Sequence, residues 1–238
     1  MRDLTPAITA APDVTLVLSI DCAVSGLAAA LVRDGEVLGL QREGGREQAA
    51  RLLPMIASLF ADAGIDRRAL SLIAVTIGPG SFTGVRVGLA AARGLAVALD
   101  VPLAGIPTTT ALLAQAPKGS RLAVAAIDSQ LGDWFCALAA QDHEPFLATA
   151  GLLAERLRDR PSLVIGPQAS SLANELVAAG VDVDAQVAVP DPVMLAQLAA
   201  AEGVVAWSAR NRAEGLPRPL YLRGVNITLP DGQRRTVE

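Results

Sequence analysis

Two aspartates have the residue type and the position for phosphate or metal chemistry in this chain of 238 residues. Asp21 follows the apolar run 14–20, and Asp128 follows the apolar run 122–127. Carboxylates at the ends of two buried strands could hold magnesium through water, as in a two-domain nucleotide clamp. The alternative is that each carboxylate accepts hydrogen bonds from N–H groups of the following turn. Both interpretations stay open at this point.

The strongest local signal is a glycine-rich segment, which reads Gly78-Pro79-Gly80-Ser81-Phe82-Thr83-Gly84-Val85-Arg86. Ser81 or Thr83 could cap a following helix, whose free N–H groups could meet an anion. A Walker A loop ends in Gly-Lys-Ser/Thr, however, and no lysine stands here to reach a terminal phosphate. A tight, well-capped turn from strand to helix is therefore favoured over a phosphate loop.

The chain has one histidine and two cysteines, which is too few for the common histidine- or cysteine-based metal and catalytic sites. His143 is the only histidine, so neither a histidine metal pair nor a Ser-His-Asp set can be assembled. Cys22 and Cys136 stand far apart without a Cys-x-x-Cys motif, as expected for buried thiols in a reducing cytosol. We expect no catalytic residue, no metal site and a cytoplasmic protein.

The composition excludes several classes of protein. Hydrophobic residues make up 52% of the chain and charged residues 18%, which rules out disorder of the bulk chain. Aromatic residues at 3% and a net charge of −4 argue against a base-stacking platform and against unaided gripping of a phosphate backbone. No uncharged apolar run reaches about 18 residues, so we expect no membrane span.

The order of expected elements suggests two similar halves. The first half has strands at 14–20, 27–33, 36–42, 72–77 and 101–105, with helices at 46–63 and 84–99. Pro54 is expected to kink the first of these helices or to delay its start. The second half has strands at 122–127, 134–140, 145–149 and 163–165, with helices at 152–158 and 169–179. A last helix at 193–209, capped by Asp191, is expected to pack back onto the sheet.

The same residue types end the corresponding strands in both halves. Each first strand ends in Asp followed shortly by Gly, and each fourth strand ends in Ile-Gly-Pro. Two mixed sheets that each open with a three-stranded meander are the pattern of the actin and hexokinase superfamily. We therefore predict an α/β protein of two actin-like, ribonuclease H-like domains at 14–107 and 108–224, with a loose lead at 1–13 and a loose tail at 225–238. The alternative is a single doubly wound sheet.

The helix at 84–99 carries small residues at Gly84, Gly88, Ala91 and Ala92 among its leucines. Small residues let another helix approach closely, so this helix should make a helix–helix contact. The contact is either with helix 46–63 of the same chain, which is the more usual case, or with another subunit.

Taken together, several segments resemble the bacterial TsaB (YeaZ) family over residues 14–223. They are Ile20-Asp21, Leu52-Leu53-Pro54-Met55-Ile56, the glycine-rich segment with Val87-Gly88, Arg93-Gly94-Leu95-Ala96, and Pro219-Leu220-Tyr221-Leu222-Arg223. The glycine-rich segment is highly specific to that family and its catalytic paralogue TsaD.

The resemblance implies a non-catalytic subunit of the complex that adds threonylcarbamoyl to the adenosine beside the anticodon of certain tRNAs. TsaD would be the transferase partner and TsaE an ATPase partner, with homodimers when the chain is alone and tRNA met only through the complex. No cofactor would be bound by this chain alone, although ATP with magnesium could occupy a site shared within the complex. Asp21 and Asp128 would mark a vestigial nucleotide cleft.

The same resemblance assigns residues. The partner-binding surface would be formed by two helices, through Leu52, Leu53, Ile56, Phe60, Val85, Gly88, Leu89, Ala92 and Leu95. The structural loop that sets the second helix would be Gly78, Pro79, Gly80, Ser81, Phe82, Thr83, Gly84 and Arg86.

The chain departs from the family pattern in two places. Arg46-Glu47-Gln48 stands where members often carry a histidine, and Asp128-Ser129-Gln130-Leu131-Gly132-Asp133-Trp134-Phe135 replaces a common Asp-Ala-Arg-x-Gly-Glu-Val-Tyr. The alternative function, suggested by the two aspartates and the glycine-rich segment, is an ATP-dependent phosphotransferase of the actin and hexokinase superfamily.

Overall fold

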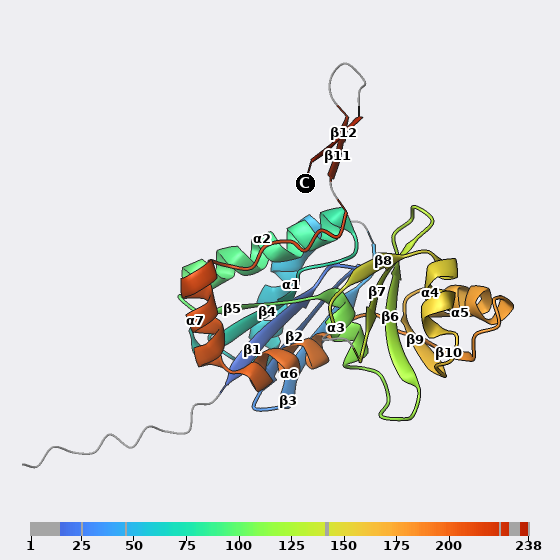
Figure 1. The fold of residues 1–238 in the computed structure, drawn as a ribbon. Helices are drawn as coiled ribbons and strands as arrows, with labels where there is room; N and C mark the ends of the chain where they lie inside the picture. Colours follow the sequence, from blue (N-terminus) through green and yellow to red (C-terminus); the bar gives the residue numbers. More distant parts are fainter. Residues whose placement is uncertain are drawn as a thin grey trace, which may run out of the picture.

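The computed structural model describes residues 15–24, 26–45, 47–140 and 143–223, and the backbone of 225–228 and 234–237. It contains two five-stranded mixed sheets, one from each half of the chain (Figure 1). The predicted fold class, two actin-like α/β domains that each open with a meander, is confirmed. The predicted loose lead at 1–13 lies outside the described residues.

The first sheet has the order β3-β2-β1-β4-β5. Its strands are β1 (Leu16–Asp21), β2 (Leu27–Arg33), β3 (Glu36–Glu43), β4 (Leu72–Thr76) and β5 (Leu103–Ile106). The meander is antiparallel, whereas β4 and β5 run parallel to β1. Asp34 and Gly35 join β2 to β3 with φ of 49° and 89°, and two positive φ values are what a type I′ hairpin turn requires.

The second sheet repeats this plan with the order β10-β9-β6-β7-β8. Its strands are β6 (Leu122–Asp128), β7 (Trp134–Leu138), β8 (Phe146–Ala148), β9 (Ser162–Gly166) and β10 (Val183–Val187). When β6 is matched to β1, both the strand order and the parallel or antiparallel pairing agree between the halves. The sequence repeats are therefore accompanied by a repeated topology.

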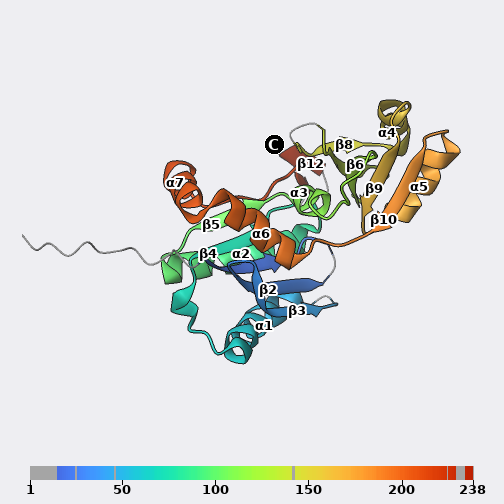
Figure 2. The ribbon, with the colours of Figure 1, turned by 90° about the horizontal axis from the view of Figure 1, so that it is seen from below.

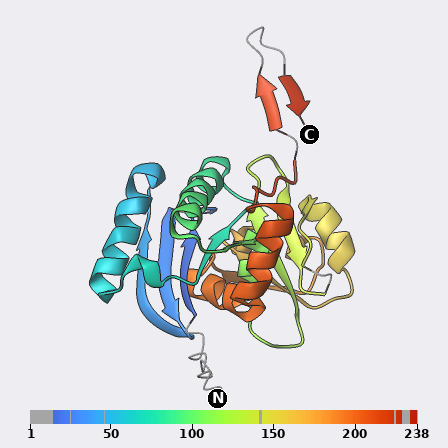
Figure 3. The same cartoon turned by 90° about the vertical axis from the view of Figure 1, so that its left-hand side faces the viewer.

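Helices cover both faces of each sheet. They are α1 (Gln48–Ala63), α2 (Phe82–Leu99), α3 (Thr108–Leu113), α4 (Ala150–Leu157), α5 (Ala169–Ala178), α6 (Pro192–Glu202) and α7 (Val204–Glu214), with a 3₁₀ turn at Arg67–Ala69. In the first half, α1 and α2 lie side by side on one face of the sheet (Figure 3). In the second half, α4 and α5 occupy the equivalent position.

The two halves exchange one helix each. α3 follows β5 but packs on the second sheet, where Leu112 and Leu113 join its apolar face. α6 follows β10 but packs on the first sheet, on the face opposite α1 (Figure 2). The hydroxyl of Ser19 in β1 donates to the carbonyl of Pro192 at 2.6 Å, which fixes the start of α6 on the sheet. Each domain is therefore completed by a helix from the other half of the sequence.

Several elements differ from the sequence-based expectation. The single helix expected at 193–209 is two helices that meet at Gly203, where φ is 91° and the axis bends by 83°. The side chain of Asp191 caps α6 as expected. α1 begins at Gln48 and continues through Pro54, so the proline does not delay its start. In the region expected to be a loose tail, β11 (Val225–Thr228) pairs antiparallel with β12 (Arg234–Val237), and the two strands stand off the two larger sheets (Figure 1).

The outer edge of the first sheet is closed by one amide side chain. β5 is the last strand of the sheet, so its outer backbone groups lack a strand neighbour. Asn211 of α7 accepts from the N–H of Leu103 at 2.7 Å and donates to its carbonyl at 3.0 Å. The side chain thus pairs with β5 as another peptide group would.

Candidate functional site

α1 presents an amphipathic surface. Its buried side carries Leu52, Met55, Ile56 and Leu59 at helical spacing, and these side chains enter the core of the first domain. The helix ends at Gly64, whose φ of 65° is the left-handed conformation that glycine adopts most easily. Its other side is left to face solvent.

α2 begins where the glycine-rich segment wraps around the turn after β1. Ser81 caps the helix by accepting from the N–H of Gly84 at 3.2 Å, and its own N–H donates to the carbonyl of Ala23 at 2.6 Å. A Cβ on Gly84 would lie 1.9 Å from the carbonyl oxygen of Cys22, so only glycine allows this approach. The backbone of the segment is thus used to seat α2 on the fold, as the structural interpretation of this loop requires.

The structure divides the nine expected partner-binding residues into two groups. Six are buried in the chain's own core: Leu52, Ile56, Val85, Gly88, Leu89 and Ala92. Their side chains pack on the first sheet or against the neighbouring helix of the same chain, so they leave little surface for another protein, although Ile56 also lines the groove described below. The remaining three, Leu53, Phe60 and Leu95, retain exposed surface.

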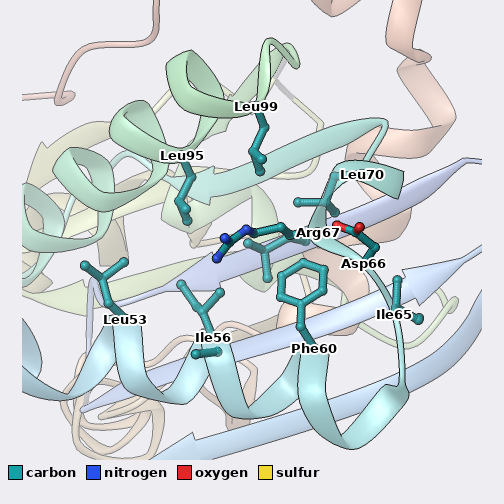
Figure 4. A pocket seen from close by; sticks show the side chains of 11 residues that line it. Leu53, Ile56, Phe60, Ile65, Asp66, Arg67, Leu70, Leu95 and Leu99 are labelled. Atoms are coloured by element: carbon teal, nitrogen blue, oxygen red, sulfur yellow. The ribbon is translucent and has the colours of Figure 1, made fainter.

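These three residues meet at an apolar groove between α1 and α2 (Figure 4). The groove has a volume of about 450 Å³, and its walls are Leu18, Leu53, Ile56, Ala57, Phe60, Ile65, Asp66, Arg67, Leu70, Leu95 and Leu99. Leu53 is 52% exposed at its edge. Arg67 and Asp66 are the charged residues among these walls, and the side chain of Arg67 reaches from the 3₁₀ turn into the space between the helices.

Asp21 is used inside the fold. It is 4% exposed, and its Oδ1 accepts from the hydroxyl of Thr76 at 2.6 Å and from the N–H of Ala23 at 3.1 Å. Burial raises the pKa of Asp21, and these hydrogen bonds together with the charge of Arg42 oppose that rise. The carboxylate therefore ties the end of β1 to β4 and to the turn that follows, which is the turn interpretation of this residue.

Asp128 has the same kind of role in the second half. It is half-buried at the end of β6, and its Oδ1 accepts from the N–H of Gln130 at 2.7 Å. The two aspartates end strands of different sheets, and each has its own turn as partner. In the part of the chain that the structure describes, no group of three or more Asp, Glu, His or Cys side chains is placed to hold a metal ion.

The remaining reactive side chains are either exposed or buried in apolar surroundings. His143 is exposed, with a φ of 59° in a turn. Burial raises the pKa of both Cys22 and Cys136 to about 12, so both thiols stay protonated at neutral pH.

α2 also has the length and apolar composition of a membrane-crossing helix, as does the bent pair α6–α7 taken as one span. Both elements pack on the first sheet, however. Gly84, Val85, Gly88 and Leu89 are among the α2 residues buried against it. α2 is thus a core helix of the first domain, and its composition reflects that position.

Comparison with known proteins identifies related sequences and structures. Residues 41–199 match the model of the family described as TsaD, tRNA N6-adenosine threonylcarbamoyltransferase. The chain is 36% identical over 123 residues to a tRNA threonylcarbamoyladenosine biosynthesis protein TsaB from Escherichia coli, which covers 51% of this chain and 53% of that protein. A TsaB protein from Haemophilus influenzae is 37% identical over 119 residues, covering 49% of this chain and 50% of that protein. The chain therefore spans about half the length of these curated relatives.

A solved structure extends the likeness to nearly the whole fold. A protein from Pseudomonas aeruginosa, described as similar to the peptidase YEAZ, superposes with a TM-score of 0.66 at 26% identity and covers 88% of this chain and 100% of that chain. The resemblance to the TsaB (YeaZ) family stated from the sequence motifs is confirmed. Since the match to the TsaD family covers more than half of the sequence, the chain belongs to that family, and several of its relatives carry the name TsaB.

Proposed function

We propose that this chain is a non-catalytic scaffold subunit in the synthesis of threonylcarbamoyladenosine in tRNA. It binds a catalytic TsaD transferase through the groove between α1 and α2 and supports the action of a TsaE-type ATPase in the cytoplasm. When the transferase is absent, the same groove is available to a second copy of the chain. Contact with tRNA is made through the complex.

One observation carries the proposal: an apolar groove lies open between two helices of a family member whose two candidate magnesium-binding carboxylates, Asp21 and Asp128, accept hydrogen bonds from their own turns. Leu53, Phe60 and Leu95 leave apolar surface in contact with water at this groove. Fully burying a leucine side chain is worth about 1.5–3 kcal/mol, so covering a half-exposed Leu53 would contribute about 1 kcal/mol to association. Contiguous exposed apolar surface of this kind marks sites of interaction with other proteins.

The contacts of the two aspartates support the proposal that the chemistry takes place on the partner and not on this chain. Asp21 is buried and hydrogen-bonded to Thr76 and Ala23, and Asp128 is bonded to its own turn. Transfer chemistry would therefore belong to the partner, with ATP and magnesium held at a site that the partner completes. No observation in the described residues favours the alternative, an ATP-dependent phosphotransferase.

The proposal is tested by light scattering on the purified chain mixed with the TsaD transferase of the same organism. A 1:1 complex is expected, and Leu53→Asp or Leu95→Asp should weaken it by about tenfold or more, since each places a charge in the apolar contact. Val97→Asp is the matched control, because Val97 is 72% exposed on the same helix and does not line the groove. Circular dichroism should show all three variants folded.

The absence of a complex between the wild-type proteins would overturn the proposal. So would a complex that survives both groove variants, because the contact would then lie elsewhere. Calorimetry with Mg-ATP on the chain alone provides a further check, in which tight binding that is lost on Asp21→Ala would favour the phosphotransferase.

A further inference from the structure

A second apolar pocket lies near the N-terminal end of α2, at the junction of the two halves. Its volume is about 390 Å³, and its walls are Gly78, Pro79, Gly80, Phe82, Val85, Leu131, Phe135, Leu220, Tyr221, Leu222 and Arg223. Phe82 and Leu95 are separated by about 20 Å along the α2 axis at 1.5 Å per residue, so this pocket is distinct from the groove between α1 and α2. We refer to it as the junction pocket.

The junction pocket is rigidly built from three segments that are distant in the sequence. The N–H of Leu220 donates to the carbonyl of Ile77 at 2.8 Å, which pairs the segment after α7 with the end of β4. Arg223 then forms an ion pair with Asp133 of the second half. The walls are thus fixed by contacts on both sides of the junction.

Large apolar side chains are exposed around the mouth of the junction pocket. Phe82 is 46% exposed, Tyr221 42% and Leu131 67%. The Phe82 and Tyr221 rings lie with centroids 5.8 Å apart. Exposed aromatic residues gathered at a concave site are typical of a binding surface.

A guanidinium is held in place at the same mouth. The Nε–H of Arg86 donates to the hydroxyl of Tyr221 at 2.8 Å, and its guanidinium carbon lies 3.6 Å from the centre of the Phe82 ring. Within the described residues, no carboxylate lies at ion-pair distance from Arg86. Its terminal nitrogens are therefore oriented donors that lack an anionic partner, and they favour a carboxylate.

The charge balance decides between two classes of macromolecule. RNA has stacking bases, but its backbone requires several cations. Arg223, which lines the pocket, is already paired with Asp133. Among the described residues at the pocket, this leaves Arg86 at the rim as the one cation that has no carboxylate partner. The net charge of the whole chain is −4. One cation beside an apolar pocket is complementary to an apolar side chain with a neighbouring carboxylate, which is the chemistry of a protein segment.

We propose that the junction pocket binds a short acidic segment of a partner protein. A large apolar side chain of that segment enters the pocket, and an adjacent Asp or Glu pairs with Arg86. The inference does not rest on the proposed function, because the groove between α1 and α2 remains free while the junction pocket is occupied.

The test selects peptides from a random library displayed on phage against the folded full-length chain. Enrichment of a large apolar residue next to Asp or Glu is expected. Binding of a synthetic peptide with the enriched sequence is then measured by fluorescence anisotropy. The Arg86→Glu protein should bind this peptide about tenfold or more weakly than wild type, since an attractive charge pair becomes repulsive. Arg93→Glu, on an exposed position of the same helix, should change the affinity little.

Charge reversal makes the test specific. A second selection against the Arg86→Glu variant should enrich Lys or Arg in place of the acidic residue, while the uncharged substitution Leu131→Ser should weaken both peptides. Failure to enrich any sequence, or the same acidic peptides with both proteins, would overturn the proposal. It would equally be overturned if an anticodon stem-loop RNA bound the chain with an affinity that Arg86→Glu and Leu131→Ser abolish.

Discussion

Replacing Gly84 with alanine should destabilise the protein although alanine is the better helix former. In an isolated helix the change would stabilise by about 1 kcal/mol. In the folded protein the new Cβ would lie 1.9 Å from the carbonyl oxygen of Cys22, a backbone atom that cannot rotate away. The start of α2 would have to move by about 1 Å or more, and overpacking of this kind costs about 1–3 kcal/mol.

Two other glycines of α2 provide matched controls. A Cβ on Gly94 would meet no atom within 4 Å, so Gly94→Ala should stabilise by about 0.5–1 kcal/mol through helix propensity. A Cβ on Gly88 would lie 3.3 Å from the Cβ of Cys22, so Gly88→Ala should fall between the two. Glycine-to-alanine substitution at these three positions of one helix is therefore expected to change the free energy of unfolding in opposite directions, depending on the distance from the new Cβ to the nearest atom.

Urea unfolding measures these differences. Tryptophan fluorescence reports on both domains, through the buried Trp207 in the first and the buried Trp134 in the second, and circular dichroism reports on all helices. With an m-value of about 2–3 kcal/mol/M, a difference of about 2–3 kcal/mol between Gly84→Ala and Gly94→Ala shifts the midpoint by about 1 M. A Gly84→Ala protein as stable as Gly94→Ala would refute the packing argument for the glycine-rich segment.

Three further predictions follow from buried polar groups. Because burial raises the pKa of Asp21 in the folded state, the stability that this group contributes is full below its unfolded pKa of about 3.9 and is lost as pH rises through the folded pKa. Asp21→Asn should therefore be at least as stable as wild type at pH 7 and should lose this advantage on acidification. Urea midpoints of both proteins measured across pH check this, and a difference that stays constant with pH would contradict it. Cys22 and Cys136, with pKa values of about 12, should react with Ellman's reagent at pH 8 only after unfolding, and a fast reaction of the native protein would contradict their burial. Asn211→Ala should cost about 1–3 kcal/mol in a thermal or urea melt because the N–H and carbonyl of Leu103 lose their partner, whereas an unchanged melt would show that water replaces the amide fully.

Much of the fold follows from patterns in the sequence, because the buried strands are short apolar runs bounded by glycine, proline and aspartate. β1 and β6 are examples, and each is followed by a turn where the sequence places one. The helix break at Gly203 is also predictable in principle, since glycine often ends a helix. The apolar residues on both sides of Gly203, however, follow one continuous helical spacing, which favours a single helix. β10 is weak in isolation: Val183, Ala185 and Val187 alternate with polar residues over only five positions.

Which of the apolar residues of α1 and α2 are exposed could be predicted only in part, and the reason is geometric. Leu52 and Leu53 are neighbours with the same chemistry, yet Leu52 is 1% exposed and Leu53 is 52% exposed. Apolar periodicity says that a helix has one buried face, but it does not say whether that face meets the chain's own sheet or another subunit. The rim of the junction pocket was likewise hidden from sequence, because Leu131 and Tyr221 are brought together only by the fold.

The exchange of α3 and α6 between the halves constrains how the protein is made. As the chain leaves the ribosome, the strands of the first sheet, which end at Ile106, emerge well before α6, the helix that covers the second face of that sheet. Val17, Ala30 and Leu72 would stay in contact with water until Leu195 and Ala199 have been synthesised. A nascent chain stopped near residue 107 would therefore leave one apolar face of the first sheet exposed to water, and the first domain can bury that face only after α6 has been synthesised.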